Sequence, residues 1–319
     1  MPSDPDSDRT SPLSRPERAR LAAFRAAESL ADLVALTGAA DADEAYLAAK
    51  EEWTSLRERE LGPASTDADF PGRTVTIDGR PFVVHGVTHA NTPEERAYLR
   101  ERVGRLREAG AAVYCEQGIR SMYFADFPDV CEMDDYRWAM TELSGREEGA
   151  PGDGLAPAAF GEFFDDVESA AETGRRLAYS LIDSGREIYG EAIATALGDV
   201  ATSFLTGPTD LSTADDFASF VLSTRAARDP SRLAALQRYY ETRFLPQPIE
   251  RTWLRRHDPD LEVATHARNE RMADYLRYHA TEAPAVHAIV GAAHQPGVAY
   301  YLERHSTGER TIEGFEPMG

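Results

Sequence analysis

The sequence predicts a mixed α/β fold, in which flanking helices cover a partly parallel central sheet and a large helical insertion separates the two halves of the sheet. Two observations lead to this prediction. Residues 72–118 spell a strand–helix–strand crossover, and a further apolar strand comes only at residues 285–291. The stretch from about residue 125 to 250 lacks strand patterns and has helical periodicity.

The chain before the sheet predicts two segments. Residues 1–17 are polar, acidic and rich in Pro and Ser, which is typical of a disordered tail. Residues 18–62 are rich in Ala and place apolar residues at helical intervals, so we expect an N-terminal segment of two or three helices. A linker over residues 62–72 then leads into an α/β domain that covers residues 72–319.

The first half of the sheet begins with a hairpin. β-branched residues alternate around Asp78 and Gly79, the strongest short-range hairpin signal. Thr92 opens the motif TPEE, which predicts a helix N-cap with a capping box closed by Glu95. Gly110 ends that helix, and the apolar run AAVYCE then predicts a buried parallel strand ending at Glu116.

The remaining elements are mostly helices. Helical patterns cover residues 163–205, 214–228, 230–244 and about 260–281. After the strand at 285–291, a helix over 295–305 and a short edge strand near 311–315 complete the prediction.

Charge and composition exclude some classes of partner. The 319 residues carry 55 Asp and Glu against 34 Lys and Arg, for a formal net charge of −21. This field repels phosphate backbones and anionic lipids, so we expect no nucleic-acid partner. Lys50 is the only lysine. An acidic surface with almost no lysine is typical of a halophilic protein, and an ordinary acidic enzyme is the alternative.

The sequence also predicts a cytoplasmic protein without a membrane span. Its two cysteines, Cys115 and Cys131, form no CxxC pair, and its N-terminus has no apolar signal segment. No stretch reaches the ~18–20 apolar residues that a membrane span requires.

Three predicted strands end in side chains that carry chemistry. Gly86-Val-Thr-His89 and Gly291-Ala-Ala-His294 share one pattern, and a third strand ends at Glu116. Ligands bind at the carboxyl ends of parallel strands, so these side chains are expected to form one site. One histidine alone is more often a structural residue, and Glu116 alone could simply pair with Arg120.

A helix before the last strand adds Arg268. It lies one turn before Met272, on the same face, where a buried guanidinium requires a carboxylate or a developing anion. A solvated basic face shared with Arg271 and Arg277 is the alternative.

These residues resemble the TraB/PrgY/GumN group, which is related to the Tiki metalloproteases and more distantly to the erythromycin esterases. The resemblance lies in the two GxxH motifs, in the strand-end Glu116, in the Arg268-Asn269 helix and above all in AIVGAAHQPGV. It covers residues 82–120 and 266–304. It implies a pocket that also contains Gly86, Arg120, Asn269 and Gly291.

We therefore expect a hydrolase of an amide or ester bond, acting on a small peptide or ester. His89, Glu116 and His294 would either bind a divalent metal such as Mn²⁺, Co²⁺ or Zn²⁺ or activate water without one, and Arg268 would stabilise the oxyanion. A non-catalytic regulatory or peptide-binding protein is the alternative. In a third interpretation, the helical middle forms a partner or homodimer interface. Cys115 and His85 are expected to point away from the site.

Overall fold

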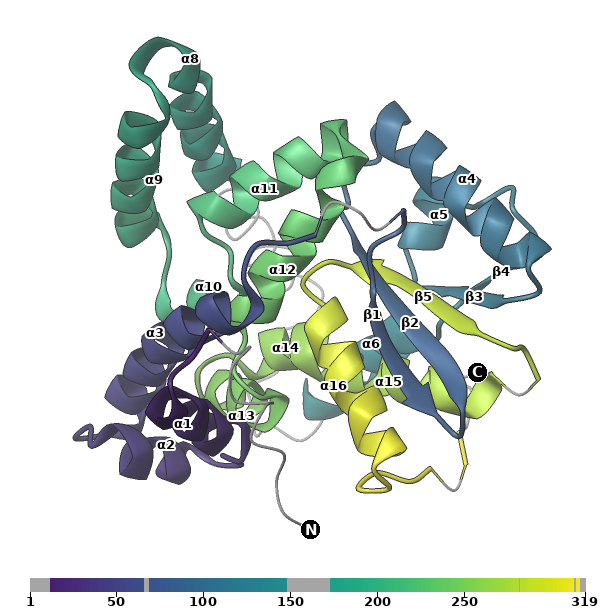
Figure 1. The fold of residues 1–319 in the computed structure, drawn as a ribbon, viewed down its shortest axis with the longest axis horizontal. Coiled ribbons are helices and arrows are strands. Elements are labelled where there is room, and N and C mark those ends of the chain that lie inside the picture. The colour runs from purple at the N-terminus through teal and green to yellow at the C-terminus, as the bar shows by residue number, and fades with distance from the viewer. Residues whose placement is uncertain (1–11, 66–68, 148–172, 281, 313, 316–319) are drawn as a thin grey trace.

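The computed structural model describes residues 12–65, 69–147, 173–280, 282–312 and 314–315 (Figure 1). Its centre is a five-stranded sheet with the strand order β1-β2-β5-β3-β4. The β1 strand is antiparallel to β2, and every other pair of neighbours is parallel. The strands are β1 (Arg73–Ile77), β2 (Arg80–Val87), β3 (Ala112–Cys115), β4 (Val130–Glu132) and β5 (Val286–Gly291). The predicted mixed α/β fold is confirmed.

The first half of the sheet forms as the sequence predicts. The β1–β2 hairpin turns at Asp78 and Gly79, which have φ angles of 51° and 78°. A two-residue turn with both φ angles positive matches the twist of the strands it joins. The chain then passes through α4 (Pro93–Glu108) to β3, and β5, which comes last, fills the place between β2 and β3.

Helices cover both faces of the sheet. On one face, α15 (Arg268–His279) and α16 (Gln295–Ser306) pack against side chains such as Val84 and Ala288. On the other face, α4 and α5 (Ile119–Tyr123) pack against Cys115 and Ile289. Adjacent strand residues point to opposite faces, which explains why Ala288 and Ile289 lie in different cores. Cys115 therefore lies on the α4 side, away from the site, as predicted.

The N-terminal helices form a core of their own. The helices α1 (Arg15–Arg25), α2 (Leu30–Thr37) and α3 (Ala42–Leu61) pack with α13 (Gln247–His257). Residues 1–11 of the predicted tail lie outside the described residues, but the boundary at residue 17 is wrong. Leu13 is buried, and the Ser14 N–H donates to the Glu17 carboxylate at 2.8 Å, which caps α1.

Between β4 and β5 the described chain is helical. Residues 173–184 form a helix that, with α8 and α9, projects from the body beside α11 (Figure 1). Residues 163–172 of the predicted helix lie outside the described part. The further elements are α6 (Asp135–Glu147), α8 (Arg186–Tyr189), α9 (Glu191–Leu205), α10 (Pro208–Thr213), α11 (Phe217–Arg228), the 3₁₀ turn η2 (Pro230–Arg232), α12 (Leu233–Arg243), α14 (Pro259–Glu262) and the π turn η3 (Val263–Ala267).

Three local predictions are wrong. The segment from residue 125 is not purely helical, because the three-residue strand β4 pairs with β3 there; only Val130 of this strand is buried, so no alternation announces it. The α11 helix begins at Phe217 rather than at residue 214, because the Asp216 carboxylate accepts the Ser219 N–H and caps it. The described residues of 311–315 form no strand; Phe315 instead packs edge-on against Tyr275.

Candidate active site

The carboxyl ends of β2, β5 and β3 meet and bring three predicted residues together. Val87 is in register with Gly291, and the Glu116 N–H donates to the Ile289 carbonyl at 2.9 Å. The Glu116 carboxylate lies at the centre of the site. Its Oε2 is 4.0 Å from His89 Nε2, and its Oε1 is 3.6 Å from His294 Nε2. Two imidazoles thus flank one carboxylate.

Glu116 is a buried, ionised carboxylate. Oε2 accepts the Gly291 N–H and Oε1 accepts an N–H of Arg268, both at 2.7 Å. Burial alone raises the pKa of Glu116, but the Arg268 cation and the Gly291 N–H both stabilise the ionised form and outweigh burial. The pKa therefore lies below its ordinary value.

His294 is oriented by Asn269. The Asn269 amide donates to Gln247 Oε1 at 3.1 Å, so its own oxygen accepts the Nδ1–H of His294 at 2.7 Å. This leaves Nε2 as the basic nitrogen that faces Glu116. Burial lowers the pKa of His294 to about 4. The imidazole is therefore neutral at pH 7, the form that a general base requires.

His89 is the most exposed of the three residues. Its side chain is 53 % exposed, against 15 % for His294 and 4 % for Glu116. The ring packs over Gly291, where a Cβ would lie only 2.5 Å from His89 Nε2. Gly86 allows a second close approach, because a Cβ there would meet the Ala292 backbone at 2.9 Å. These contacts give both predicted glycines a physical role.

Arg268 reaches the site but lies behind the carboxylate. Its Nε and Nη2 donate to Asp135 Oδ2 at 2.9 and 2.5 Å, and Nη2 also donates to Glu116. The pair with a carboxylate that the sequence allowed is thus present, whereas the solvated face is not. Because its Nε and Nη2 are bound to carboxylates, Arg268 holds Glu116 rather than facing a substrate, so the predicted oxyanion role has no geometric support.

Asp135 is a site residue that sequence reasoning missed. It is fully buried at the start of α6, and burial raises the pKa of its carboxyl to about 6 although Arg268 opposes the shift. The pair Asp134-Asp135 was the available signal. Its position beside the sheet depends on β4, which the sequence pattern does not reveal.

Two other predicted residues point elsewhere. Arg120 donates from Nε to the Val130 carbonyl at 2.8 Å, so it braces β4 rather than pairing with Glu116. His85 turns away from the site, as expected: its Nδ1 lies 2.8 Å from the Pro71 carbonyl and its Nε2 lies 2.9 Å from His287 Nδ1.

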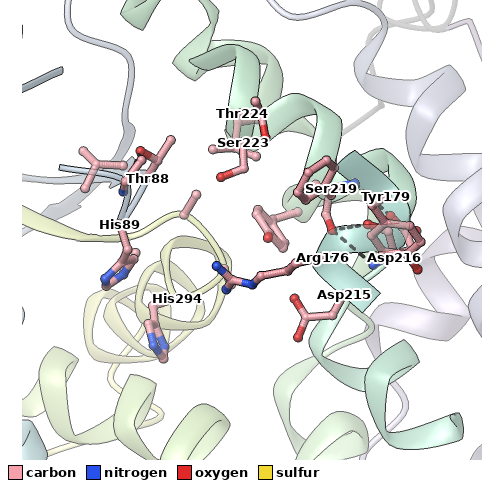
Figure 2. Close-up of a pocket in the computed structure, with 18 of the residues that line it drawn as sticks. Thr88, His89, Arg176, Tyr179, Asp215, Asp216, Ser219, Ser223, Thr224 and His294 are labelled. Atoms are coloured by element: carbon pink, nitrogen blue, oxygen red, sulfur yellow. Dashed lines mark hydrogen bonds between the residues drawn. The ribbon is translucent and has the colours of Figure 1, made fainter. Parts of the chain in front are cut away.

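A cavity of about 360 Å³ opens in front of the two histidines. His89, Gly291 and His294 form its sheet side, and the helix over 173–184 and α11 form the opposite side. Figure 2 shows Arg176 reaching into this space toward the histidines, with Ser223 and Thr224 above it. Sequence patterns do not indicate this second wall, because its residues come from helices that meet only in the fold.

The predicted metal has little support in this geometry. No group of three or more His, Cys, Asp or Glu side chains within the described ranges is arranged to hold a metal ion. Both oxygens of Glu116 already accept N–H donors, one from the Arg268 cation. The Arg268 cation beside this carboxylate opposes the binding of a second cation there. We therefore derive no step through a metal.

Comparisons of this chain with protein-family models, with curated proteins and with solved structures find no match. Within the part of the chain that the structure describes, no helix is long and apolar enough to cross a membrane.

Proposed function

We propose that the protein hydrolyses an ester or amide bond, with His294 as general base and Glu116 as the carboxylate that stabilises it. One observation carries the proposal: a neutral imidazole of fixed tautomer faces a buried carboxylate, beside a second histidine, at the base of a cavity. Buried titratable groups with shifted pKa values that meet at a cavity are typical of acid–base sites.

The reaction needs only this chain's residues and water. His294 Nε2 takes a proton from water as the water oxygen attacks the substrate carbonyl carbon. Glu116 stabilises the imidazolium that forms, and Arg268 and Gly291 hold Glu116 in place. His294 then returns the proton to the leaving oxygen or nitrogen as its bond to carbon breaks, which gives an acid and an alcohol or amine.

His89 interacts with the substrate carbonyl oxygen in the proposed reaction. Its exposed imidazole lies at the cavity, where a substrate carbonyl must sit to meet the water. We assign it the hydrogen bond to the developing oxyanion, a contribution typically worth about 3–4 kcal/mol per donor.

The cavity favours a polar substrate. Its lining includes Arg176, Asp215, Ser223 and Thr224 beside the aromatic rings of Phe220 and Tyr240. Charged and hydroxyl groups on one wall suit an acyl compound that has hydroxyl or ionic substituents rather than a plain fatty ester.

A panel of small esters and peptide amides tests the proposal. We expect turnover by the wild-type protein in EDTA, and a loss of 10²-fold or more in His294→Ala and His89→Ala with little change in melting temperature. His257→Ala is the matched control, because His257 Nε2 lies 3.2 Å from Asp43 Oδ1, on helices that do not line the cavity. No turnover on any substrate would overturn the proposal and favour a binding protein.

The same panel tests the metal. When bound, a divalent ion would supply a water of lowered pKa, held by His89, Glu116 and His294. Activity that EDTA abolishes and Mn²⁺, Co²⁺ or Zn²⁺ restores would support that arrangement and contradict the metal-free route.

A further inference from the structure

Glu95, which the sequence predicts to close a capping box, makes different hydrogen bonds in the structure. Thr92 caps α4 as predicted, because its hydroxyl accepts the Glu95 N–H at 3.2 Å. A capping box would also bring the Glu95 carboxylate back to the Thr92 N–H. Instead, the carboxylate turns toward Thr88, the residue directly before His89.

Glu95 ties down the start of the loop that carries His89. It is fully buried, and its two oxygens accept the Thr88 N–H at 2.8 Å and the Thr88 hydroxyl at 2.6 Å. The Tyr123 hydroxyl also donates to Glu95, at 2.7 Å. A carboxylate with three donors in a buried site forms a strong, directional anchor.

Tyr123 extends this anchor past His89. Its hydroxyl oxygen accepts the Asn91 N–H at 2.9 Å and lies 3.0 Å from the Thr88 carbonyl. The backbone is therefore fixed at residues 88 and 91, on both sides of His89. We call Thr88, Glu95 and Tyr123 the loop anchor.

The His89 ring depends on this anchor. Among the described residues, no hydrogen bond holds its imidazole, and its nearest acidic atom is Glu116 Oε2 at 4.0 Å. Half of the side chain faces the cavity. The position of Nε2 is therefore set by the backbone and by the contact with Gly291, unlike that of His294, which Asn269 fixes directly.

We propose that Glu95 is a positioning residue for His89, acting through Thr88 and Tyr123. This inference rests on the proposed hydrolytic function for its kinetic consequence. A small displacement of a reacting group lowers the rate more than it lowers substrate binding. Loss of the anchor should therefore reduce kcat and leave KM nearly unchanged.

Two pairs of variants separate positioning from stability. Glu95→Gln removes the charge of the anchor, and Glu250→Gln is its matched control. Glu250 is also fully buried and also accepts one backbone N–H, from Leu245 at 2.7 Å, and one tyrosine hydroxyl, from Tyr46 at 2.6 Å. Thr88→Val removes only the hydroxyl, whereas Thr88→Ser keeps both hydrogen bonds to Glu95.

We expect kcat to fall about 10–10²-fold in Glu95→Gln and Thr88→Val, with KM within about twofold. Thr88→Ser should retain most of the wild-type kcat. Glu250→Gln should lower the melting temperature without lowering kcat at a temperature where the protein is folded. Equal losses of kcat in Glu95→Gln and Glu250→Gln, or wild-type kcat in Glu95→Gln, would overturn the inference.

A spectroscopic measurement distinguishes this inference from the proposed function. In protein labelled at the histidine ring carbons, the His89 signal is assigned by its absence in His89→Asn. It should shift or broaden in Glu95→Gln and Thr88→Val but not in Glu250→Gln. If it does so in a protein that hydrolyses nothing, the anchor stands and the hydrolase proposal fails. An unmoved His89 signal overturns the anchor, whatever the activity.

Discussion

The imidazole of His89 lies against the bare Cα of Gly291, where a Cβ would come within 2.5 Å of Nε2. This contact joins the ends of β2 and β5 and sets how closely the two histidine motifs approach Glu116. The requirement for glycine at this position is therefore steric, and it leads to a direct prediction.

Gly291→Ala should displace His89 and lower kcat by about 10²-fold. The protein should remain folded, because the half-exposed ring can move into the cavity. Gly104→Ala is the control: a Cβ there meets nothing within 4 Å, and alanine in a helix is more stable than glycine by about 1 kcal/mol. Initial rates and melting temperatures of both variants check this. Wild-type kcat in Gly291→Ala would contradict it.

The low pKa of His294 predicts an unusual pH profile. The general base must be neutral, so kcat/KM should rise with pH through about pH 4, the pKa of this buried imidazole, rather than through the ordinary 6.5. Activity at pH 5 should be close to that at pH 7. A pH–rate profile whose acidic limb is centred near pH 6.5 would contradict the assignment of His294 as the general base.

The free energy of unfolding should also depend on the protonation of His294. The folded-state pKa of about 4 lies below the ordinary value of 6.5, so the unfolded chain takes up the proton first as pH falls. The contribution of His294 to stability is complete above about pH 6.5 and is lost as pH falls toward 4. Urea unfolding of the wild type and of His294→Gln over this range measures it. The two curves should converge at low pH, and a constant gap would refute the assignment.

The only lysine of the sequence makes a specific set of contacts. Lys50 Nζ lies 2.9 Å from both Glu250 and the Tyr46 hydroxyl and packs over the rings of Tyr46 and Phe244. Its compact ammonium suits this partly buried site, whereas a planar guanidinium is larger.

Lys50→Arg should therefore lower the free energy of unfolding by about 1–3 kcal/mol through overpacking. Arg232→Lys, at an exposed pair with Asp229, should change it by less than about 0.5 kcal/mol. Denaturant unfolding compares the two. Equal stability of Lys50→Arg and the wild type would show that the site tolerates either cation.

The net charge of −21 predicts that salt stabilises the protein. Screening weakens the mutual repulsion of surface carboxylates, so the melting temperature should rise steadily from dilute buffer to molar KCl. Full stability in dilute buffer would contradict the halophilic interpretation and favour an ordinary acidic protein.

The sequence was most informative where local rules and strand topology act alone. Asp78 and Gly79 specify their turn by backbone conformation, and strand ends must meet at one edge of a parallel sheet. This is why Glu116, His89 and His294 could be expected together. The helix face that carries Arg268 could be read from its spacing to Met272.

The parts that could not be predicted depend on distant contacts. Asp135 approaches Arg268 only because β4 joins the sheet, and a three-residue strand leaves no pattern. The sequence left a pairing of Arg120 with Glu116 open as an alternative, but the turn after β3 directs Arg120 to the Val130 carbonyl. Glu95 matches a capping box in the sequence, but in the folded protein its carboxylate accepts hydrogen bonds from Thr88 instead of from the Thr92 N–H.

Glu116→Gln tests the central claim most directly, because it keeps the shape of the side chain and removes only its charge. The measurement is kcat/KM for the best substrate of the ester and amide panel, in EDTA, together with the melting temperature. We expect a folded variant whose kcat/KM is lower by at least about 10²-fold. A folded Glu116→Gln protein that hydrolyses the substrate as fast as the wild type would contradict the proposed site.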